Sequence, residues 1–180
     1  MTLAEPRVIA IAGMPGAGKS TTAALLASRL PRAAHVEADK LQQMILAGGE
    51  WPDGTPTPSE EAARQLRLRL DNACLLARSF VAAGFTAVVD DIVIGSRVDD
   101  LFEDLDGVPL SFVMLTPDYE VVRQRWLAID SPYADRWAWI DDEIRTRTRR
   151  LGLWLDTTAL TPGQAVDEIV RRLPEAAVAT

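Results

Sequence analysis

This sequence has one cysteine, one histidine and no long apolar run, and each shortage excludes a class of protein. The single cysteine, Cys74, cannot form an internal disulfide, and its apolar neighbours predict a buried thiol on a helix. A chain without disulfides suits a reducing cytoplasm, which is the expected location. The single histidine, His35, excludes a histidine-based catalytic triad or zinc site and is interpreted as structural. No apolar run reaches the roughly 18 residues of a membrane-spanning helix.

The chain is also short of positive charge. It has 19 Lys and Arg residues and 26 Asp and Glu residues, so the formal net charge is −7. Because nucleic-acid binding relies on a basic surface, this balance argues against a nucleic-acid partner. The N-terminal stretch 1–7 lacks a basic region followed by an apolar one, so a signal peptide is not expected. We therefore expect neither a nucleic-acid nor a membrane partner.

The rest of the composition is that of an ordinary globular protein. The chain has 180 residues, of which 48% are hydrophobic, and this suits one domain with a proper core. Strands are predicted over 7–12, 34–37, 85–89, 109–115 and 153–155, and helices over 19–30, 40–46, 57–83, 96–105, 117–127, 136–150 and 161–173. This alternation favours an α/β fold, a parallel sheet with helices on both faces, in which ligands bind beyond the carboxyl ends of the strands.

Two of the predicted helices begin with capping signals. Thr57 precedes a proline and stands three residues before Glu60, and Thr161 has the same relation to Gln164. Apolar residues in the first of these helices recur at spacings of three and four, which indicates one buried face. The residues of that face are Leu66, Leu70, Ala73, Ala77 and Phe80.

The first predicted strand runs directly into Gly13-Met14-Pro15-Gly16-Ala17-Gly18-Lys19-Ser20, a full match to the phosphate-binding pattern G-x-x-x-x-G-K-[ST]. A strand before the motif and a helix after it are the context that it requires. Glycines let the backbone approach a ligand, and the N–H groups of such a loop form a concave nest for phosphate oxygens. Lys19 would reach the β- and γ-phosphates, and Ser20 would hold Mg²⁺. The expected nucleotide-binding residues are Gly13, Pro15, Gly16, Ala17, Gly18, Lys19, Ser20 and Thr21.

Acidic residues stand at the ends of two other predicted strands. Asp90 and Asp91 follow 85–89, where a protein with this loop places its second magnesium carboxylate. Neighbouring strand residues face opposite sides, so the choice between the two stays open, with Asp90 favoured for the metal. Asp39 follows 34–37 and is interpreted as a general base or positioning group for an acceptor hydroxyl, as a helix N-cap, or as both.

Arginines are the candidates for stabilising a transferred phosphoryl group. Arg123 and Arg125 stand near the end of one predicted helix, and Arg136 stands across the irregular segment 128–135, which indicates a small lid. Arg125 and Arg136 are the candidate catalytic arginines. A further run on the next helix accompanies acidic residues, so surface ion pairs explain it equally well: Arg145, Arg147, Arg149 and Arg150.

Three tryptophans stand near these segments, and two explanations are open for each. Trp51 lies in a loop rich in glycine and proline, and Trp137 and Trp139 flank the lid. Each of them either caps an acceptor molecule or fills the core.

The loop 13–20, Asp39, the pair Asp90-Asp91, the arginine-bearing lid and the stretch 156–162 together resemble the small P-loop kinases. The chain is most similar to the chloramphenicol phosphotransferase-like group, with shikimate and gluconate kinases more distant. This resemblance implies a five-stranded parallel sheet in the order 2-3-1-4-5. It also implies transfer of the γ-phosphoryl group of ATP, with Mg²⁺, to a hydroxyl of a small molecule.

The same resemblance assigns individual roles. It places the general base at Asp39. It also places the stretch 156–162, with Thr158, against one face of the adenine and Arg125 against the other face of the adenine. The segment 48–58 departs from the antibiotic kinase in detail, which argues against chloramphenicol as the acceptor. The sequence contains no guanine-reading N-K-x-D motif, which argues against a GTPase.

These observations predict an ATP:alcohol phosphotransferase acting on a small metabolite or antibiotic. The expected organisation is a single domain over 1–180, with a substrate cap over about 40–83 and a lid over about 125–140. The partner is a small molecule with a hydroxyl group, and the protein is a monomer or homodimer. Two alternatives remain: a nucleoside or nucleotide kinase, and an ATP-binding switch or accessory protein that acts through a partner.

Overall fold

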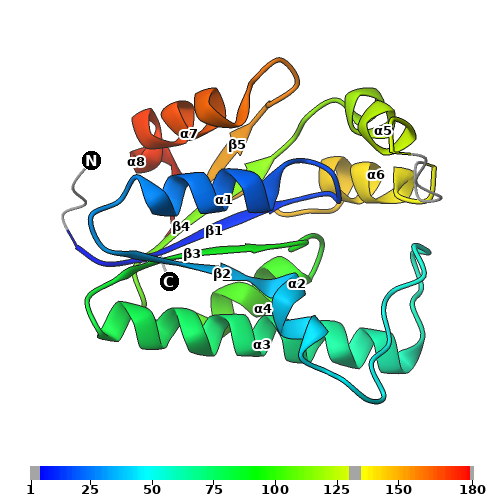
Figure 1. Cartoon of the computed structure of the whole chain (residues 1–180), viewed down its shortest axis with the longest axis horizontal. Coiled ribbons are helices and arrows are strands. Elements are labelled where there is room, and N and C mark those ends of the chain that lie inside the picture. The colour runs from blue at the N-terminus through cyan, green and yellow to red at the C-terminus, as the bar shows by residue number, and fades with distance from the viewer. Residues whose placement is uncertain (1–4, 130–134, 179–180) are drawn as a thin grey trace.

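Six strands form one sheet within residues 5–129 and 135–178, the part of the chain that this computed structural model describes. Five of them are parallel, in the order β2-β3-β1-β4-β5 (Figure 1). Their bounds are β1 (Val8–Gly13), β2 (Ala33–Glu37), β3 (Thr86–Asp91), β4 (Leu110–Leu115) and β5 (Leu153–Leu155). This order confirms the α/β sheet, 2-3-1-4-5, that the family resemblance implied. The short β6 (Ala177–Val178) is an addition to the expected strands and pairs antiparallel with β4.

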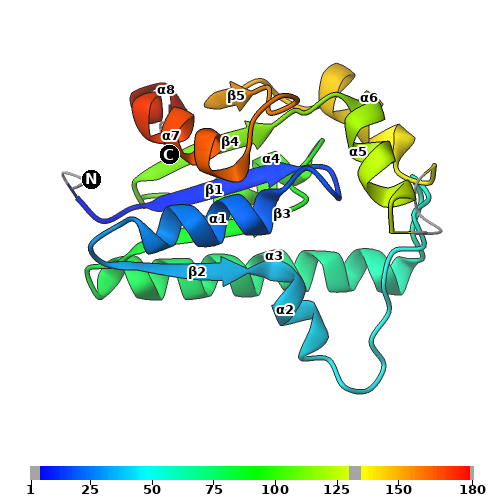
Figure 2. The same cartoon turned by 45° about the horizontal axis from the view of Figure 1, so that its top comes forward.

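Helices cover both faces of the sheet, as Figures 1 and 2 show. One face carries α1 (Lys19–Ser28), α7 (Pro162–Arg171) and the short α8 (Leu173–Ala176), and the other carries α3 (Glu60–Ala82) and α4 (Arg97–Asp104). The remaining helices, α2 (Ala38–Gln43), α5 (Tyr119–Leu127) and α6 (Ala138–Thr146), lie toward the carboxyl ends of the strands, on the right in Figure 1. Among the described residues, no helix is both long and apolar enough to span a membrane.

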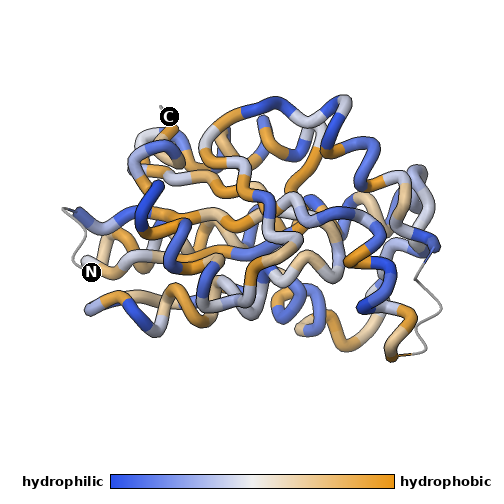
Figure 3. The backbone as a smooth tube through the Cα atoms, turned by 90° about the horizontal axis from the view of Figure 1, so that it is seen from above, coloured by the Kyte–Doolittle hydropathy of each residue, from blue (hydrophilic) through white to orange (hydrophobic). Residues whose placement is uncertain are grey.

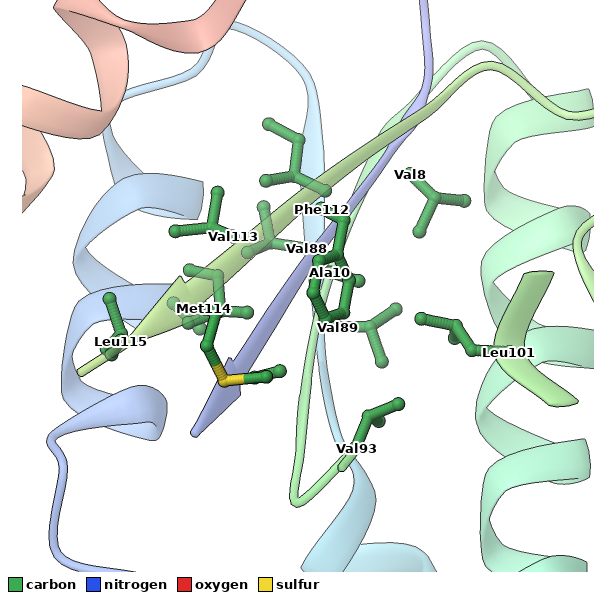
Figure 4. Close-up of a cluster of buried hydrophobic side chains, with 14 of the residues drawn as sticks. Val8, Ala10, Val88, Val89, Val93, Leu101, Phe112, Val113, Met114 and Leu115 are labelled. Atoms are coloured by element: carbon green, nitrogen blue, oxygen red, sulfur yellow. The ribbon is translucent and has the colours of Figure 1, made fainter. Parts of the chain in front are cut away.

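The three central strands, β1, β3 and β4, are buried at every position. A parallel sheet covered on both faces requires this, because side chains on both sides of each strand meet a helix layer. Figure 4 shows Phe112 of β4 among side chains of β1 and β3, with Leu101 of α4 facing them. In Figure 3, hydrophobic runs follow the segments through the middle of the molecule. The packed core therefore holds the strand ends that carry the phosphate loop and the two aspartates.

The start of α3 differs from the sequence prediction. The N-cap is Ser59, whose hydroxyl oxygen accepts a hydrogen bond of 3.0 Å from Ala62 N, and not Thr57. Both residues have the hydroxyl that a cap needs, and Ser59 directly precedes two glutamates that suit the positive end of the helix. Phe80 is also wrong as a core residue, because it is 36% exposed and packs edge-on against Phe85.

Other local predictions are confirmed, except that one helix is shorter than expected. Thr161 caps α7 in a reciprocal capping box with Gln164. Cys74 is buried on α3, and burial raises the pKa of its thiol to about 12. The helix expected over 136–150 covers only Ala138–Thr146. Beyond it the hydroxyl of Thr148 donates to Glu143 O at 3.0 Å and accepts from Gly95 N at 2.9 Å, which ties this segment to the β3–α4 connection.

Candidate active site

The phosphate loop connects β1 to α1, as its motif requires. Gly18, the residue before α1, has a φ of 91°, a left-handed conformation that glycine adopts without steric cost. Gly16 has a φ of 80° and lies directly under α5: a Cβ atom there would be 2.7 Å from Trp126 Nε1 and 2.9 Å from Val122 Cγ1. The loop is therefore held between the sheet and α5.

Lys19 begins α1, and its side chain turns back over the loop. Its Nζ donates a hydrogen bond of 3.0 Å to Met14 O. Burial lowers the pKa of the ammonium group, although Asp90, Asp39 and Asp91 each act to raise it. The cost of removing this cation from water thus outweighs three nearby carboxylates. Phosphate oxygens would supply the interactions that water no longer provides, which suits the role predicted for Lys19.

Asp90 connects α1 to two strands. Ser20 Oγ donates to Asp90 Oδ2 at 2.6 Å, and His35 Nε2 lies 2.6 Å from Asp90 Oδ1. His35, interpreted from the sequence as structural, lies inside β2, and its partner is the predicted metal carboxylate. A hydroxyl and a carboxylate are oxygen ligands of the kind that Mg²⁺ prefers, so this pair fits the metal. The described residues contain no group of three or more His, Cys, Asp or Glu side chains arranged as a metal site, so phosphates and water would complete the coordination.

Asp91 faces the opposite side of β3 from Asp90, as the alternation along a strand requires. Its Oδ1 accepts a hydrogen bond of 2.5 Å from Arg69, and its Oδ2 accepts a hydrogen bond of 3.0 Å from Arg97. Burial lowers the pKa of the Arg97 guanidinium against the pull of Asp91. Asp91 is therefore occupied by arginines, while Asp90 contacts Ser20. The assignment of Asp90 to the metal stays a prediction and has this contact in its support.

Asp39 is not a helix N-cap, so that interpretation is wrong. The helix α2 begins one residue earlier, at Ala38, with Glu37 in the cap position. The Asp39 carboxylate, 52% exposed, accepts a hydrogen bond of 2.8 Å from Arg69, whose own side chain is only 2% exposed. One guanidinium thus bridges Asp39 and Asp91, and its Nε is buried without a hydrogen-bond partner among the described residues.

A cavity of about 500 Å³ lies beside this bridge. We call it the aromatic cavity, because Trp51, Trp126, Trp137 and Trp139 all line it. Pro15 of the phosphate loop and Asp39 also belong to its wall, and Asp39 is close enough to Lys19 to raise the pKa of that ammonium. The three tryptophans for which the sequence left two explanations open therefore contribute to a hollow next to the phosphate loop.

The roof of the aromatic cavity joins two distant parts of the chain. In Figure 1, the loop between α2 and α3 rises toward α5 and α6. There Trp139 Nε1 donates to Gly54 O at 2.9 Å, and Arg136 donates to Asp53 O at 3.1 Å. Arg136, a candidate for stabilising the transferred phosphoryl group, thus contacts this roof, and its catalytic role stays a prediction. Part of the predicted lid, residues 130–134, lies outside the described residues.

A second hollow, of about 320 Å³, opens on the other side of the phosphate loop. Gly16, Arg125 and Thr157 line it, and Arg125 donates to Gly16 O at 3.1 Å. Thr158 was predicted to contact the adenine, but its hydroxyl has partners within the protein. The hydroxyl donates a hydrogen bond to Asp156 and accepts one of 2.8 Å from Asp118 N. The stretch 156–162 thus borders this hollow through Thr157, Leu160 and Pro162, and not through the Thr158 hydroxyl.

Sequence reasoning missed Arg69, Arg97 and Trp126. The signal for Arg69 was present, since it stands one residue before Leu70 and four before Ala73, on the face of α3 expected to be buried. A charged residue within an apolar stripe indicates a buried partner. For Arg97 and Trp126 no local signal existed, because their contacts come from other elements.

The fold has relatives among solved structures, although no curated protein matches this chain in sequence. The Deinococcus radiodurans tunicamycin resistance protein is 23% identical, with a TM-score of 0.69 over 98% of this chain and 100% of that one. A Sinorhizobium meliloti gluconokinase is 20% identical, with a TM-score of 0.66 over 96% and 94%. Candida albicans thymidylate kinase is 16% identical, with a TM-score of 0.65 over 98% and 96%. At these identities the likenesses establish the fold, and they confirm the predicted resemblance to small P-loop kinases.

The sequence itself matches one family model, described as an AAA domain, over residues 9–146. The match begins in β1 and ends at the last residue of α6, so it includes the phosphate loop, Asp39, the aspartates of β3 and the four cavity tryptophans. It covers well over half of the chain. This protein therefore belongs to the AAA domain family and has the fold of a small P-loop kinase.

Proposed function

We propose that this protein transfers the γ-phosphoryl group of ATP to a hydroxyl group of a small molecule bound in the aromatic cavity. One observation carries the proposal: the phosphate loop lies between two hollows, with Pro15 in the wall of one and Gly16 in the wall of the other. A nucleotide base on one side and an acceptor on the other would place the γ-phosphate between them. This is the arrangement that in-line transfer requires.

Each side of the loop supplies part of the chemistry. On the nucleotide side, the loop N–H groups and Lys19 hold the phosphates, and Arg125 borders the base. Ser20 and Asp90 would hold Mg²⁺, which neutralises the charge on the transferring oxygens when it is bound. These assignments also place phosphate oxygens beside the Lys19 ammonium, which burial has removed from water and whose pKa burial lowers.

On the acceptor side, Asp39 stands where the cavity meets the loop. It accepts the proton of the acceptor hydroxyl as the oxygen of that hydroxyl forms its bond to the γ-phosphorus. The bond between that phosphorus and the β-phosphate bridging oxygen breaks, and ADP leaves with those electrons. Arg69 orients the Asp39 carboxylate, so the free oxygen can face the cavity. In this proposal the segment 40–83 caps the acceptor, and the segment 125–140 acts as the lid.

The direct test is ADP release from Mg-ATP in the presence of candidate acceptors, with mass spectrometry of the acceptor. We expect stimulation by one acceptor class and a mass gain of one phosphoryl group. Asp39→Asn should lower the stimulated rate by about 10²–10⁴-fold, the usual contribution of a general base, while ATP still binds. Asp99→Asn, an exposed change on α4, is the matched control.

Lys19→Ala should abolish transfer and leave the circular dichroism spectrum unchanged, whereas Lys40→Ala should retain transfer. Unchanged turnover in Lys19→Ala would disprove the assignment. Stimulation only by nucleosides or nucleoside monophosphates would instead support the nucleotide-kinase alternative. Stimulation by a protein and by none of the small molecules would support the switch alternative.

A further inference from the structure

We infer that the acceptor is an uncharged or cationic molecule with a flat, aromatic body, and not a sugar acid, a sugar phosphate or a nucleoside monophosphate. This inference rests on the proposed function, because it names the substrate class of the same cavity. It follows from two properties of the cavity wall: its composition and the state of its charged groups.

The wall is predominantly apolar. Twelve of its nineteen residues are Trp, Pro, Ile or Leu, so most of the surface offers no hydrogen-bonding group to a ligand. A polyol or sugar acid bound there would lose water at most of its hydroxyls without replacement, which is costly. A planar ring system, in contrast, would gain from burial and from stacking on tryptophan faces. Of the four cavity tryptophans, Trp51 is the most available, since it is 48% exposed.

The cations of the wall are already paired. Arg69 binds Asp39 and Asp91, and Arg97 binds Asp91 and donates to Ile92 O at 2.9 Å. A kinase for an anionic acceptor needs a guanidinium whose charge is available to the ligand, as bidentate recognition of carboxylates and phosphates shows. Here each guanidinium charge is balanced by carboxylates of the protein.

The remaining charge in the wall is negative. Glu143 lines the cavity, and among the described residues it pairs with Arg147, which is 3.4 Å away and mostly exposed to solvent. Such an exposed pair neutralises little. Asp39 and Glu143 balance the two arginines of the wall, and Asp91 behind the wall pairs with both guanidinium groups, so the cavity offers an anionic ligand no uncompensated positive charge.

Three probes with the same nitrophenyl ring but different charge test this inference. They are the neutral 2-(4-nitrophenyl)ethanol, the cationic 2-(4-nitrophenyl)ethylamine and the anion of (4-nitrophenyl)acetic acid, called the acetate below. The nitrophenyl ring quenches tryptophan fluorescence, so binding is read without any turnover. We expect saturable quenching by the alcohol and the amine, and at least about tenfold weaker binding of the acetate. Trp51→Ala should weaken binding of the alcohol by about tenfold, because it removes one stacking face.

The matched control is Trp154→Ala, which removes a tryptophan of β5 that does not line the cavity. Binding of the alcohol should be the same as in the parent protein. The inference is overturned if the acetate binds as tightly as the alcohol, or if none of the three probes binds at millimolar concentration.

Parallel assays of ADP release separate this inference from the proposed function. If gluconate or AMP stimulates ADP release and neutral aryl alcohols do not, the protein is a kinase and the inferred acceptor class is wrong. If the aryl alcohol binds and ATP binds, but no phosphoryl group is transferred to any aryl alcohol or anionic acceptor, the ligand class stands and the proposed function fails. Transfer to aryl alcohols, with none to gluconate or AMP, supports both.

Discussion

Arg69 of α3 lies 2.8 Å from the carboxylate of Asp39 on α2, and this ion pair joins the wall of the aromatic cavity to the sheet. The same guanidinium reaches Asp91 of β3 at 2.5 Å. A buried cation with two carboxylate partners cannot be removed without leaving Asp91 partly uncompensated, because Arg97 is then the one ion-pair partner left to it among the described residues. Arg69 is therefore expected to stabilise the fold and to orient the proposed base.

Substitution of Arg69 tests this double role. Arg69→Met should lower the free energy of unfolding by about 3–5 kcal/mol, the usual cost of breaking a buried ion pair from one side. Arg64→Met, on an exposed position of the same helix, should change it by no more than about 0.5 kcal/mol. Urea denaturation followed by circular dichroism measures both. An equal effect of the two substitutions would show that the bridge contributes nothing to stability.

Gly16→Ala should destabilise the phosphate loop through a steric clash with α5 as well as through backbone strain. A methyl group at Gly16 would meet Trp126 and Val122 at less than van der Waals distance, and φ is 80°. We expect a loss of about 2–3 kcal/mol in unfolding free energy and weaker ATP binding. Gly107→Ala is the control for strain alone, since its φ is 73° and nothing lies within 4 Å, so it should cost about 1 kcal/mol.

ATP binding should be accompanied by proton uptake at pH values between the pKa of Lys19 in the free protein and its pKa in the complex. Burial lowers the pKa of Lys19 in the free protein, and phosphate oxygens beside Nζ would raise it in the complex. Between these two pKa values the free protein has lost a proton that the complex retains, so affinity falls as pH rises through the lowered pKa. Titration calorimetry in two buffers of different ionisation enthalpy measures the uptake, which Lys19→Met should abolish and Lys40→Met should retain. Proton release on binding would contradict this assignment.

Ser20→Ala should raise the Mg²⁺ concentration needed for half-maximal turnover by about tenfold or more, with ATP still bound by the loop. The reason is the loss of the hydroxyl that lies 2.6 Å from Asp90, the pair expected to hold the metal. Ser28→Ala is the matched control, because its hydroxyl donates only to Leu25 O at the far end of α1. An unchanged Mg²⁺ requirement in Ser20→Ala would remove Ser20 from the metal site.

Local sequence patterns were sufficient where the determining interactions are themselves local. The phosphate loop, the capping box at Thr161 and the alternation of strands and helices all depend on residues a few positions apart. Prediction failed where two nearby residues could both cap the same helix, as Thr57 and Ser59 could. It also failed where the exposure of a side chain depends on segments distant in the sequence, as at Phe80.

The sequence by itself therefore determined the fold class, the phosphate loop and the position of each acidic residue relative to its strand. Only the tertiary structure decided the partner of each of those residues. Asp90 meets Ser20 and His35, whereas Asp91 meets two arginines from α3 and α4, because β3 turns successive side chains to opposite faces. Likewise, four tryptophans far apart in the chain became one cavity wall, since that wall exists only once the α2–α3 loop meets α5 and α6.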